Sequence, residues 1–69
     1  MSKPDWKDAP EWAMYMAQDS EISGSSWTWF EVEPYMQGDY WIQPDGSKCC
    51  YALPGKDNAK WKKSLERRP

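Results

Sequence analysis

The fold is decided by the stretch WTWFEVE at residues 27–33, which ends at Pro34. Aromatic and β-branched residues fill this stretch, and both classes are enriched in β-strands. Successive side chains of a strand point to opposite faces of a sheet, so Trp27 and Trp29 lie on one face and Phe30 on the other. Because both faces carry large aromatic rings, each face is either covered by another part of the chain or presents aromatic surface to solvent.

Further strands are expected on either side of this stretch. The connection at residues 35–39 contains Gly and has the length of a hairpin loop, and YWIQ at residues 40–43 predicts the next strand. The sequence PDGS at residues 44–47 is typical of a turn, and a short strand follows at residues 48–53. Toward the N-terminus, alternating side chains favour a strand at residues 11–18, although Ala and Met leave a short amphipathic helix open there.

The last segment of the chain has helical spacing. Asp57 or Asn58 can cap a helix that begins near Ala59, and Trp61 and Leu65 lie four residues apart on one face of such a helix. The sequence therefore predicts an α+β fold. We expect a small antiparallel β-meander of three or four strands, with the short C-terminal helix packed on one face.

The length and composition limit what the chain can be. With 69 residues it forms one small domain, in which we expect residues 1–10 to be an extended arm and residues 11–69 to fold. Six Trp and four Tyr supply the large apolar side chains, so we expect a core built mostly from aromatic rings. No apolar stretch has the length of a transmembrane helix, and the N-terminus lacks the apolar region of a secretory signal. We therefore expect a cytoplasmic protein that makes no contact with membranes.

The sequence lacks the residue types on which much enzyme chemistry depends. It contains no His, the commonest general base and the usual activator of Ser or Cys nucleophiles. Cys49 and Cys50 are the only cysteines, and without His they make no zinc ligand set, so we expect a reduced pair in a strand with one thiol facing inward. Glu31 and Glu33 share one strand face, which is typical of a solvated surface. We expect no catalysis, no metal and no cofactor.

Parts of the sequence resemble small accessory proteins encoded by tailed bacteriophages. These parts are APEWA at residues 9–13, WTWFE at residues 27–31 with Pro34, Trp41, and WKKSLERRP at residues 61–69. The resemblance covers nearly the whole chain, and the closing W-x-x-S-L-x-x-R-P pattern is its most distinctive part. Because those proteins mostly have no assigned function, the resemblance implies a phage origin and a location in the host cytoplasm, and it transfers no catalytic residue.

The aromatic residues point to a partner-binding surface. Trp and Tyr dominate binding hot spots, and exposed aromatic clusters mark interaction sites. The candidates for such a patch are Trp27, Trp29, Tyr35, Tyr40 and Trp41. Alternatively, the N-terminal arm folds back with Trp6 over the second face of the sheet, and all these rings belong to the core. We expect a non-enzymatic protein that binds a bacterial host protein through the patch and modulates it, in host takeover or anti-defence.

The charges are divided unevenly along the chain. Residues 1–55 carry three Lys and nine acidic side chains, whereas residues 56–69 carry six basic and two acidic side chains. Basic side chains beside stacking aromatics suit single-stranded nucleic acid, which is the alternative function. The side chains considered for it are Lys60, Lys62, Lys63, Arg67 and Arg68. The net charge of −2 opposes this alternative, because nucleic-acid-binding domains are usually basic. The sequence leaves the oligomeric state open between a monomer and a weak homodimer.

Overall fold

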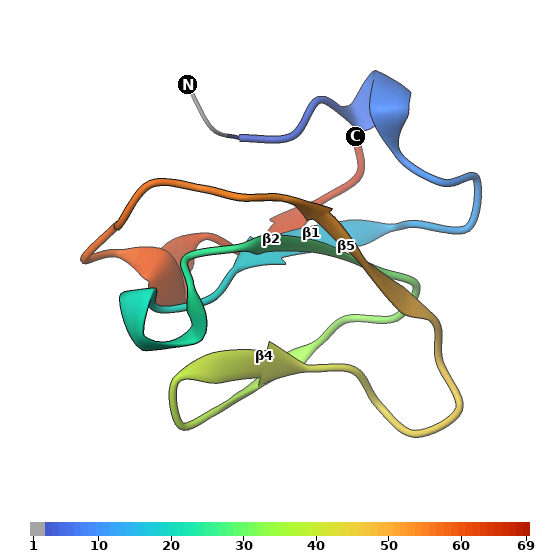
Figure 1. The fold of residues 1–69 in the computed structure, drawn as a ribbon. Helices are drawn as coiled ribbons and strands as arrows, with labels where there is room; N and C mark the ends of the chain where they lie inside the picture. The colour runs from blue at the N-terminus through green and yellow to red at the C-terminus, as the bar shows by residue number, and fades with distance from the viewer. Residues whose placement is uncertain (1–2) are drawn as a thin grey trace.

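The computed structural model describes residues 3–69, and over this range the chain is mostly antiparallel β-structure (Figure 1). The strands are β1 (Tyr15–Gln18), β2 (Trp27–Phe30), β3 (Tyr35–Gln37), β4 (Tyr40–Ile42), β5 (Cys49–Leu53) and β6 (Glu66–Arg67). Three single 3-10 turns accompany them: η1 (Trp6–Asp8), η2 (Glu21–Ser23) and η3 (Trp61–Lys63). No helix in this described part has the length and apolar character needed to cross a lipid bilayer.

Four strands form the main sheet in the order β5–β2–β1–β6, and all neighbouring strands are antiparallel. Met16 of β1 lies opposite Trp29 of β2 on one side and opposite Glu66 of β6 on the other. The pairing of β2 with β5 shifts its register between Trp27 and Thr28. The sheet thus places the last strand of the chain directly beside the first.

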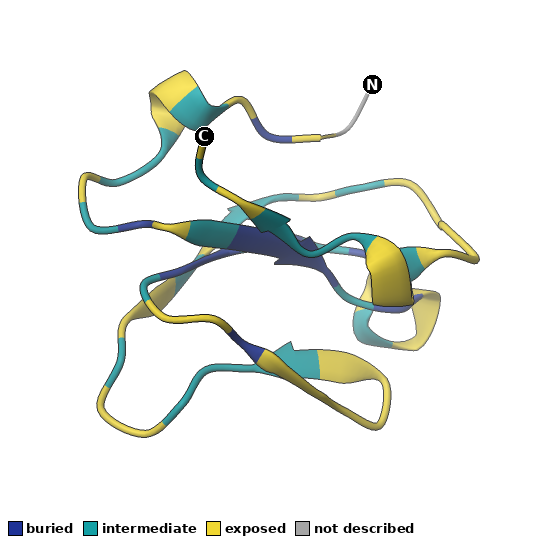
Figure 2. Cartoon of the chain, turned by 180° about the vertical axis from the view of Figure 1, so that it is seen from behind, coloured by how far each residue is buried: buried dark blue, intermediate teal, exposed yellow. Residues whose placement is uncertain are grey.

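Strands β3 and β4 form a separate two-stranded hairpin, joined by Gly38 and Asp39. Gly38 has a φ of 64°, a backbone conformation that glycine adopts without the steric cost of a Cβ atom. Figures 1 and 2 show the main sheet between two layers, with the N-terminal segment on one side and the hairpin on the other. The sheet is therefore covered on both faces, although the chain is short.

The core fills the space between the main sheet and the N-terminal segment. Ala13, Met16 and Trp29 are buried there, and the ring of Trp6 packs on Trp29 with 5.2 Å between ring centroids. The N-terminal segment is therefore not simply extended: η1 forms within it, and Trp6 folds back onto the sheet, as the alternative prediction from the sequence describes. Because side chains alternate, Phe30 points to the opposite face of the sheet, toward the hairpin, and is 2% exposed.

The predicted C-terminal helix is wrong, and with it the helical half of the α+β prediction. The segment forms the single turn η3, followed by β6. Ser64 accounts for the change of direction, because its hydroxyl donates to the carbonyl of Trp61 (2.6 Å) and accepts from the backbone N–H of Gln18 (2.8 Å). These bonds compete with helix formation and turn the chain along β1. A helix of this length is also marginal without strong packing.

The predicted strands are present, but the meander order is wrong. Residues 15–18, 27–30, 40–42 and 49–53 are strands, within the predicted segments, whereas the predicted 35–39 connection contains β3. In a meander β2 would pair with the next strand in sequence, but it pairs with β1 and β5. The chain leaves the sheet after Phe30 and makes the hairpin elsewhere before β5 returns beside β2.

Candidate functional site

Trp41 fastens the β3–β4 hairpin to the main sheet. Its indole N–H donates to the carbonyl of Gln18 at the end of β1 (3.0 Å), and its backbone N–H donates to the carboxylate of Asp19 (2.9 Å). Burial raises the pKa of Asp19, and the hydrogen bond from Trp41 opposes this rise. Trp41 is half-buried, so its role in this structure is to hold the hairpin in place.

The hairpin turn is held at a second point. The carbonyl of Asp39 accepts a hydrogen bond from the backbone N–H of Ser20 (3.2 Å) and another from the hydroxyl of Ser23 (3.2 Å). Both donors belong to the segment around η2, which follows β1. The hairpin is therefore fixed both along β4 and at its tip.

The face of the hairpin opposite Trp41 is rich in tyrosine. Tyr35 lies opposite Ile42, and Gln37 lies opposite Tyr40, so these four side chains share one face. Tyr35 is 52% exposed and Tyr40 is 47% exposed. Because Trp41 is directed to the main sheet, this second face points away from the body of the protein. We call Tyr35, Gln37, Tyr40 and Ile42 the tyrosine face.

Trp27 and Trp29 lie in the core instead of in a surface patch. They are 7% and 4% exposed, on the side of the sheet that the N-terminal segment covers. Trp6 supplies the ring that closes over Trp29. The predicted patch is therefore corrected to the hairpin, where Tyr35 and Tyr40 are at the surface.

The basic residues considered for nucleic acid do not line one helix face, because the helix is absent. Lys60, Lys62 and Lys63 are exposed on and beside η3, and Arg67 is exposed on β6. Arg68 has a structural role instead: its guanidinium donates to the carbonyls of Ala13 (2.7 Å) and Pro10 (3.2 Å). These side chains therefore have different local settings.

The two cysteines are free thiols on β5, where Cys49 is exposed and Cys50 is half-buried against the core. This agrees with the predicted reduced pair. Burial raises the pKa of the Cys50 thiol, and the neighbouring Cys49 raises it further. Cys50 is therefore a poor nucleophile, since the thiolate is the reactive form. Among residues 3–69 no three His, Cys, Asp or Glu side chains are grouped so as to hold a metal ion.

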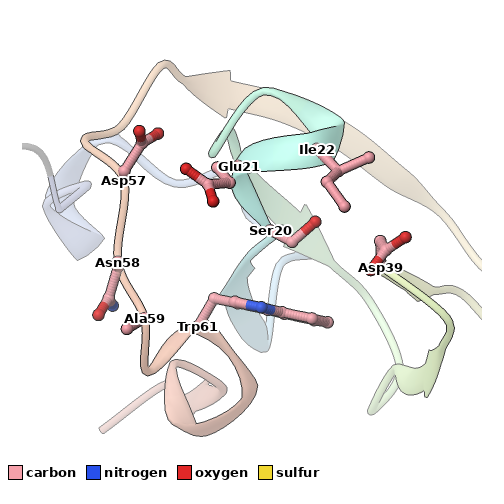
Figure 3. Close-up of a pocket in the computed structure, with 8 residues that line it drawn as sticks. All are labelled: Ser20, Glu21, Ile22, Asp39, Asp57, Asn58, Ala59 and Trp61. Carbon is pink, nitrogen blue, oxygen red and sulfur yellow. The ribbon is translucent and has the colours of Figure 1, made fainter.

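A hollow of about 340 Å³ lies beside the hairpin turn (Figure 3). Its lining comes from three separate parts of the chain: Ser20, Glu21 and Ile22, then Asp39, then residues 57–59 with Trp61. Three of these residues are acidic and none is basic. This site was not predicted from the sequence, because its residues are up to 41 positions apart and follow no local pattern.

The wall of the hollow formed by residues 57–59 is held by a buried amide. The Gln18 side chain donates to the carbonyls of Ser25 (3.0 Å) and Lys56 (2.7 Å) and accepts from the Asn58 amide (3.2 Å). The hydroxyl of Ser25 donates to the Asp57 carboxylate (2.7 Å). This network gives an otherwise irregular segment a defined position beside the hollow.

No protein-family model, no curated protein and no solved structure matches this chain. The tyrosine face and the acidic hollow are therefore the observations from which function is argued.

Proposed function

We propose that this chain is a non-catalytic accessory protein of a tailed bacteriophage that binds a bacterial host protein in the host cytoplasm and modulates it, in host takeover or anti-defence. The observation that carries the proposal is the tyrosine face, on which Tyr35 and Tyr40 are about half exposed beside Ile42. Tyrosine offers a large contact area with few rotatable bonds, so its burial in a partner is favourable.

The attachment of the hairpin supports the same conclusion. A binding loop that is mobile before association loses conformational entropy when it binds, and this loss weakens the complex. The hydrogen bonds of Trp41 and of Asp39 already fix the hairpin to the body of the protein. The tyrosine face is therefore presented in a preorganised form.

The phage origin and the host target rest on the resemblance of the sequence, above all on W-x-x-S-L-x-x-R-P at residues 61–69. The absence of His from the sequence supports a binding role over acid–base catalysis. Steric blockage of a host protein is the mechanism that fits a small domain with one rigid aromatic surface.

A pull-down with tyrosine variants tests this proposal. The tagged protein is mixed with nuclease-treated bacterial lysate, and captured proteins are identified by mass spectrometry. We expect one stoichiometric host protein, lost in the Tyr35→Ala/Tyr40→Ala variant. The matched control is Tyr51→Ala, which removes a 61% exposed tyrosine from β5 in the other sheet and leaves capture intact. Circular dichroism establishes that both variants are folded.

Two results would reject the proposal. Capture that survives the double substitution excludes the tyrosine face as the binding surface. Recovery of nucleic acid alone from untreated lysate, with binding that falls steeply as salt rises, favours the single-stranded nucleic-acid function through exposed Lys60, Lys62 and Lys63. Sizing chromatography of the free protein shows whether the tyrosine faces of two copies pair with each other instead.

A further inference from the structure

We propose that the hollow beside the hairpin turn binds an arginine side chain of the partner protein. This inference rests on the proposed function, because the arginine belongs to the protein docked on the tyrosine face. Glu21, Asp39 and Asp57 line the hollow, and no Lys or Arg does. The lining therefore supplies carboxylates that can pair with a cationic group.

Two of the three carboxylates are available to a ligand. Within residues 3–69, Glu21 and Asp39 have neither an ion pair nor a side-chain hydrogen bond, whereas Asp57 accepts a hydrogen bond from Ser25. Glu21 belongs to η2 and Asp39 to the hairpin turn, so acceptors reach the hollow from two separate segments. Figure 3 shows them on either side of Ser20.

Ser20 supplies an independent observation at the same place. It is only 4% exposed, and its hydroxyl has no hydrogen-bond partner in the described part of the chain. Figure 3 shows the hydroxyl directed toward the end of the hollow between Ile22 and Asp39. A buried hydroxyl without a partner is unfavourable, so a ligand that donates a hydrogen bond there gains affinity.

Trp61 favours a planar cation. In Figure 3 its indole is seen edge-on below Ser20, with one ring face toward the hollow. The ring already attracts a positive charge, since the ammonium of Lys62 lies 5.9 Å from the ring centroid. A guanidinium stacks on an aromatic face and donates in its own plane to several acceptors, whereas an ammonium is a compact point charge. The combination of Trp61, two carboxylates and a hydroxyl therefore fits arginine better than lysine.

The hollow is also in the right place for a docked partner. Asp39 precedes Tyr40 in sequence, so the hollow and the tyrosine face include adjacent residues of the hairpin. A partner that covers Tyr40 has neighbouring residues above the hollow. Arginine is one of the residues enriched at protein interfaces and at their hot spots.

An NMR titration with N-acetyl-arginine amide tests the inference without the partner. We expect the indole N–H resonance of Trp61, assigned with Trp61→Phe, to shift and saturate with a dissociation constant on the order of millimolar. Glu21→Gln and Asp39→Asn should each weaken binding by about threefold or more, as for an exposed ion pair. Glu33→Gln, at an exposed carboxylate outside the hollow, removes the same charge and should leave the affinity unchanged.

The neutral analogue N-acetyl-citrulline amide and N-acetyl-lysine amide complete the test. We expect no saturable shift with citrulline and weaker binding with lysine. If N-acetyl-lysine amide binds as well as the arginine compound, the hollow does not recognise a guanidinium, and the inference is overturned. If Glu33→Gln weakens binding as much as Glu21→Gln, binding depends only on the net charge of the protein, and the inference is overturned as well. Ser20→Ala should weaken arginine binding without lowering the melting temperature, since its hydroxyl has no partner to lose.

The two proposals fail separately in this design. Tyr35→Ala/Tyr40→Ala should abolish capture of the host protein and leave the arginine titration unchanged. A protein that captures its partner but does not bind N-acetyl-arginine amide retains the proposed function and loses the arginine site. A protein that binds the amide but captures no host protein retains the arginine site and loses the proposed function.

Discussion

Gly55 lies in a confined position just after β5, with less space for a Cβ atom than Gly24, Gly38 or Gly46. A Cβ atom at this position would lie 2.5 Å from the carbonyl oxygen of Ser25, 2.6 Å from Nε2 of Gln18 and 3.0 Å from Cδ1 of Trp27. One of these neighbours is backbone, and Gln18 is fixed by its own hydrogen bonds. Space at Gly55 is therefore limited by atoms that cannot easily move.

We expect Gly55→Ala to lower the free energy of unfolding by about 2–3 kcal/mol, as overpacking of a tight site does. Urea denaturation followed by tryptophan fluorescence measures it. Gly46→Ala is the matched control, because its Cβ would meet open space and only its φ of 80° opposes the change, at a cost of about 1 kcal/mol. Equal losses in the two variants would show that space at Gly55 is not the cause.

Glu66 makes stability depend on pH. Partial burial raises its pKa, but the hydrogen bonds from the Lys3 ammonium and the Trp6 indole (2.9 Å), with the charge of Lys3, lower it overall. A lowered pKa in the folded state stabilises the protein above the pKa of the unfolded state, and this contribution disappears as pH falls through the folded pKa. Glu66→Gln should therefore lower the urea midpoint at pH 7 and have a smaller effect at pH 3.

Asp19 makes stability depend on pH in the direction opposite to that of Glu66. Burial raises its pKa, so its contribution is present below the unfolded value of 3.8 and is lost as pH rises through the folded value. Asp19→Asn keeps an oxygen acceptor for the Trp41 N–H, and we expect it to be neutral or stabilising at pH 7. If the effects of Glu66→Gln and Asp19→Asn on the urea midpoint change in the same direction with pH, the directions assigned to the two pKa shifts are wrong.

At the scale of the elements, the hairpin depends on Trp41 for its attachment. Trp41→Phe keeps an aromatic ring but removes the indole N–H that donates to Gln18. We expect the hairpin to lose about 1 kcal/mol of stability, which is the usual net contribution of one hydrogen bond. We expect this loss to be confined to the hairpin. Amide hydrogen exchange should speed up at residues 35–42 and remain slow in β1 and β2. Uniform acceleration across both sheets would show that the hairpin and the main sheet unfold as one unit.

Strands β1, β2, β4 and β5 were predictable because their residue types favour extended backbone, whereas β3 and β6 were not predicted. Strands form within WTWFEVE, within YWIQ and in the segment before Pro54, since aromatic and β-branched residues favour extended backbone. Their pairing was not predictable, because nothing local tells β2 to pair with β5 and not with β3. The C-terminal helix failed for a related reason. The spacing of Trp61 and Leu65 is compatible with a helix, but tertiary bonds of Ser64 to β1 override it.

The candidate site was predictable only in part. Tyr35 and Tyr40 were named as aromatic candidates for an exposed patch, but their pairing in one hairpin was not predicted, because residues 35–39 were expected to be a connection. The burial of Trp27 and Trp29 depends on a remote segment, the arm with Trp6, which the sequence leaves as one of two alternatives. The hollow is formed by three segments that only the completed fold brings together.

At the scale of the whole molecule, Arg68 ties the C-terminal segment to the N-terminal segment. Its guanidinium donates to the carbonyls of Pro10 and Ala13 and lies 5.7 Å from the ring centroid of Trp6, and its backbone N–H donates to Met14 (2.7 Å). These contacts close the core at its N-terminal side. They span up to 62 positions of sequence, so they contribute to the stability of the molecule as a whole.

We expect Arg68→Lys to lower the free energy of unfolding by about 1–3 kcal/mol, because a compact ammonium does not reproduce the hydrogen bonds of the guanidinium together with its contact with the Trp6 ring. Arg67→Lys, at the exposed neighbouring position on β6, should change it by less than about 0.5 kcal/mol. Chemical denaturation of both variants gives the comparison. Equal effects at the two positions would show that Arg68 acts only through its charge.

The position of β6 beside β1 has a consequence for how the protein is made. Strands β1 and β2 are synthesised early, yet the strand that completes their sheet is at residues 66–67. At elongation rates of 5–20 residues per second, synthesis from residue 30 to residue 68 takes about 2–8 s. During that interval β1 lacks the strand that pairs with it at Tyr15 and Met16, so the four-stranded sheet is completed only after residues 66–67 have left the ribosome.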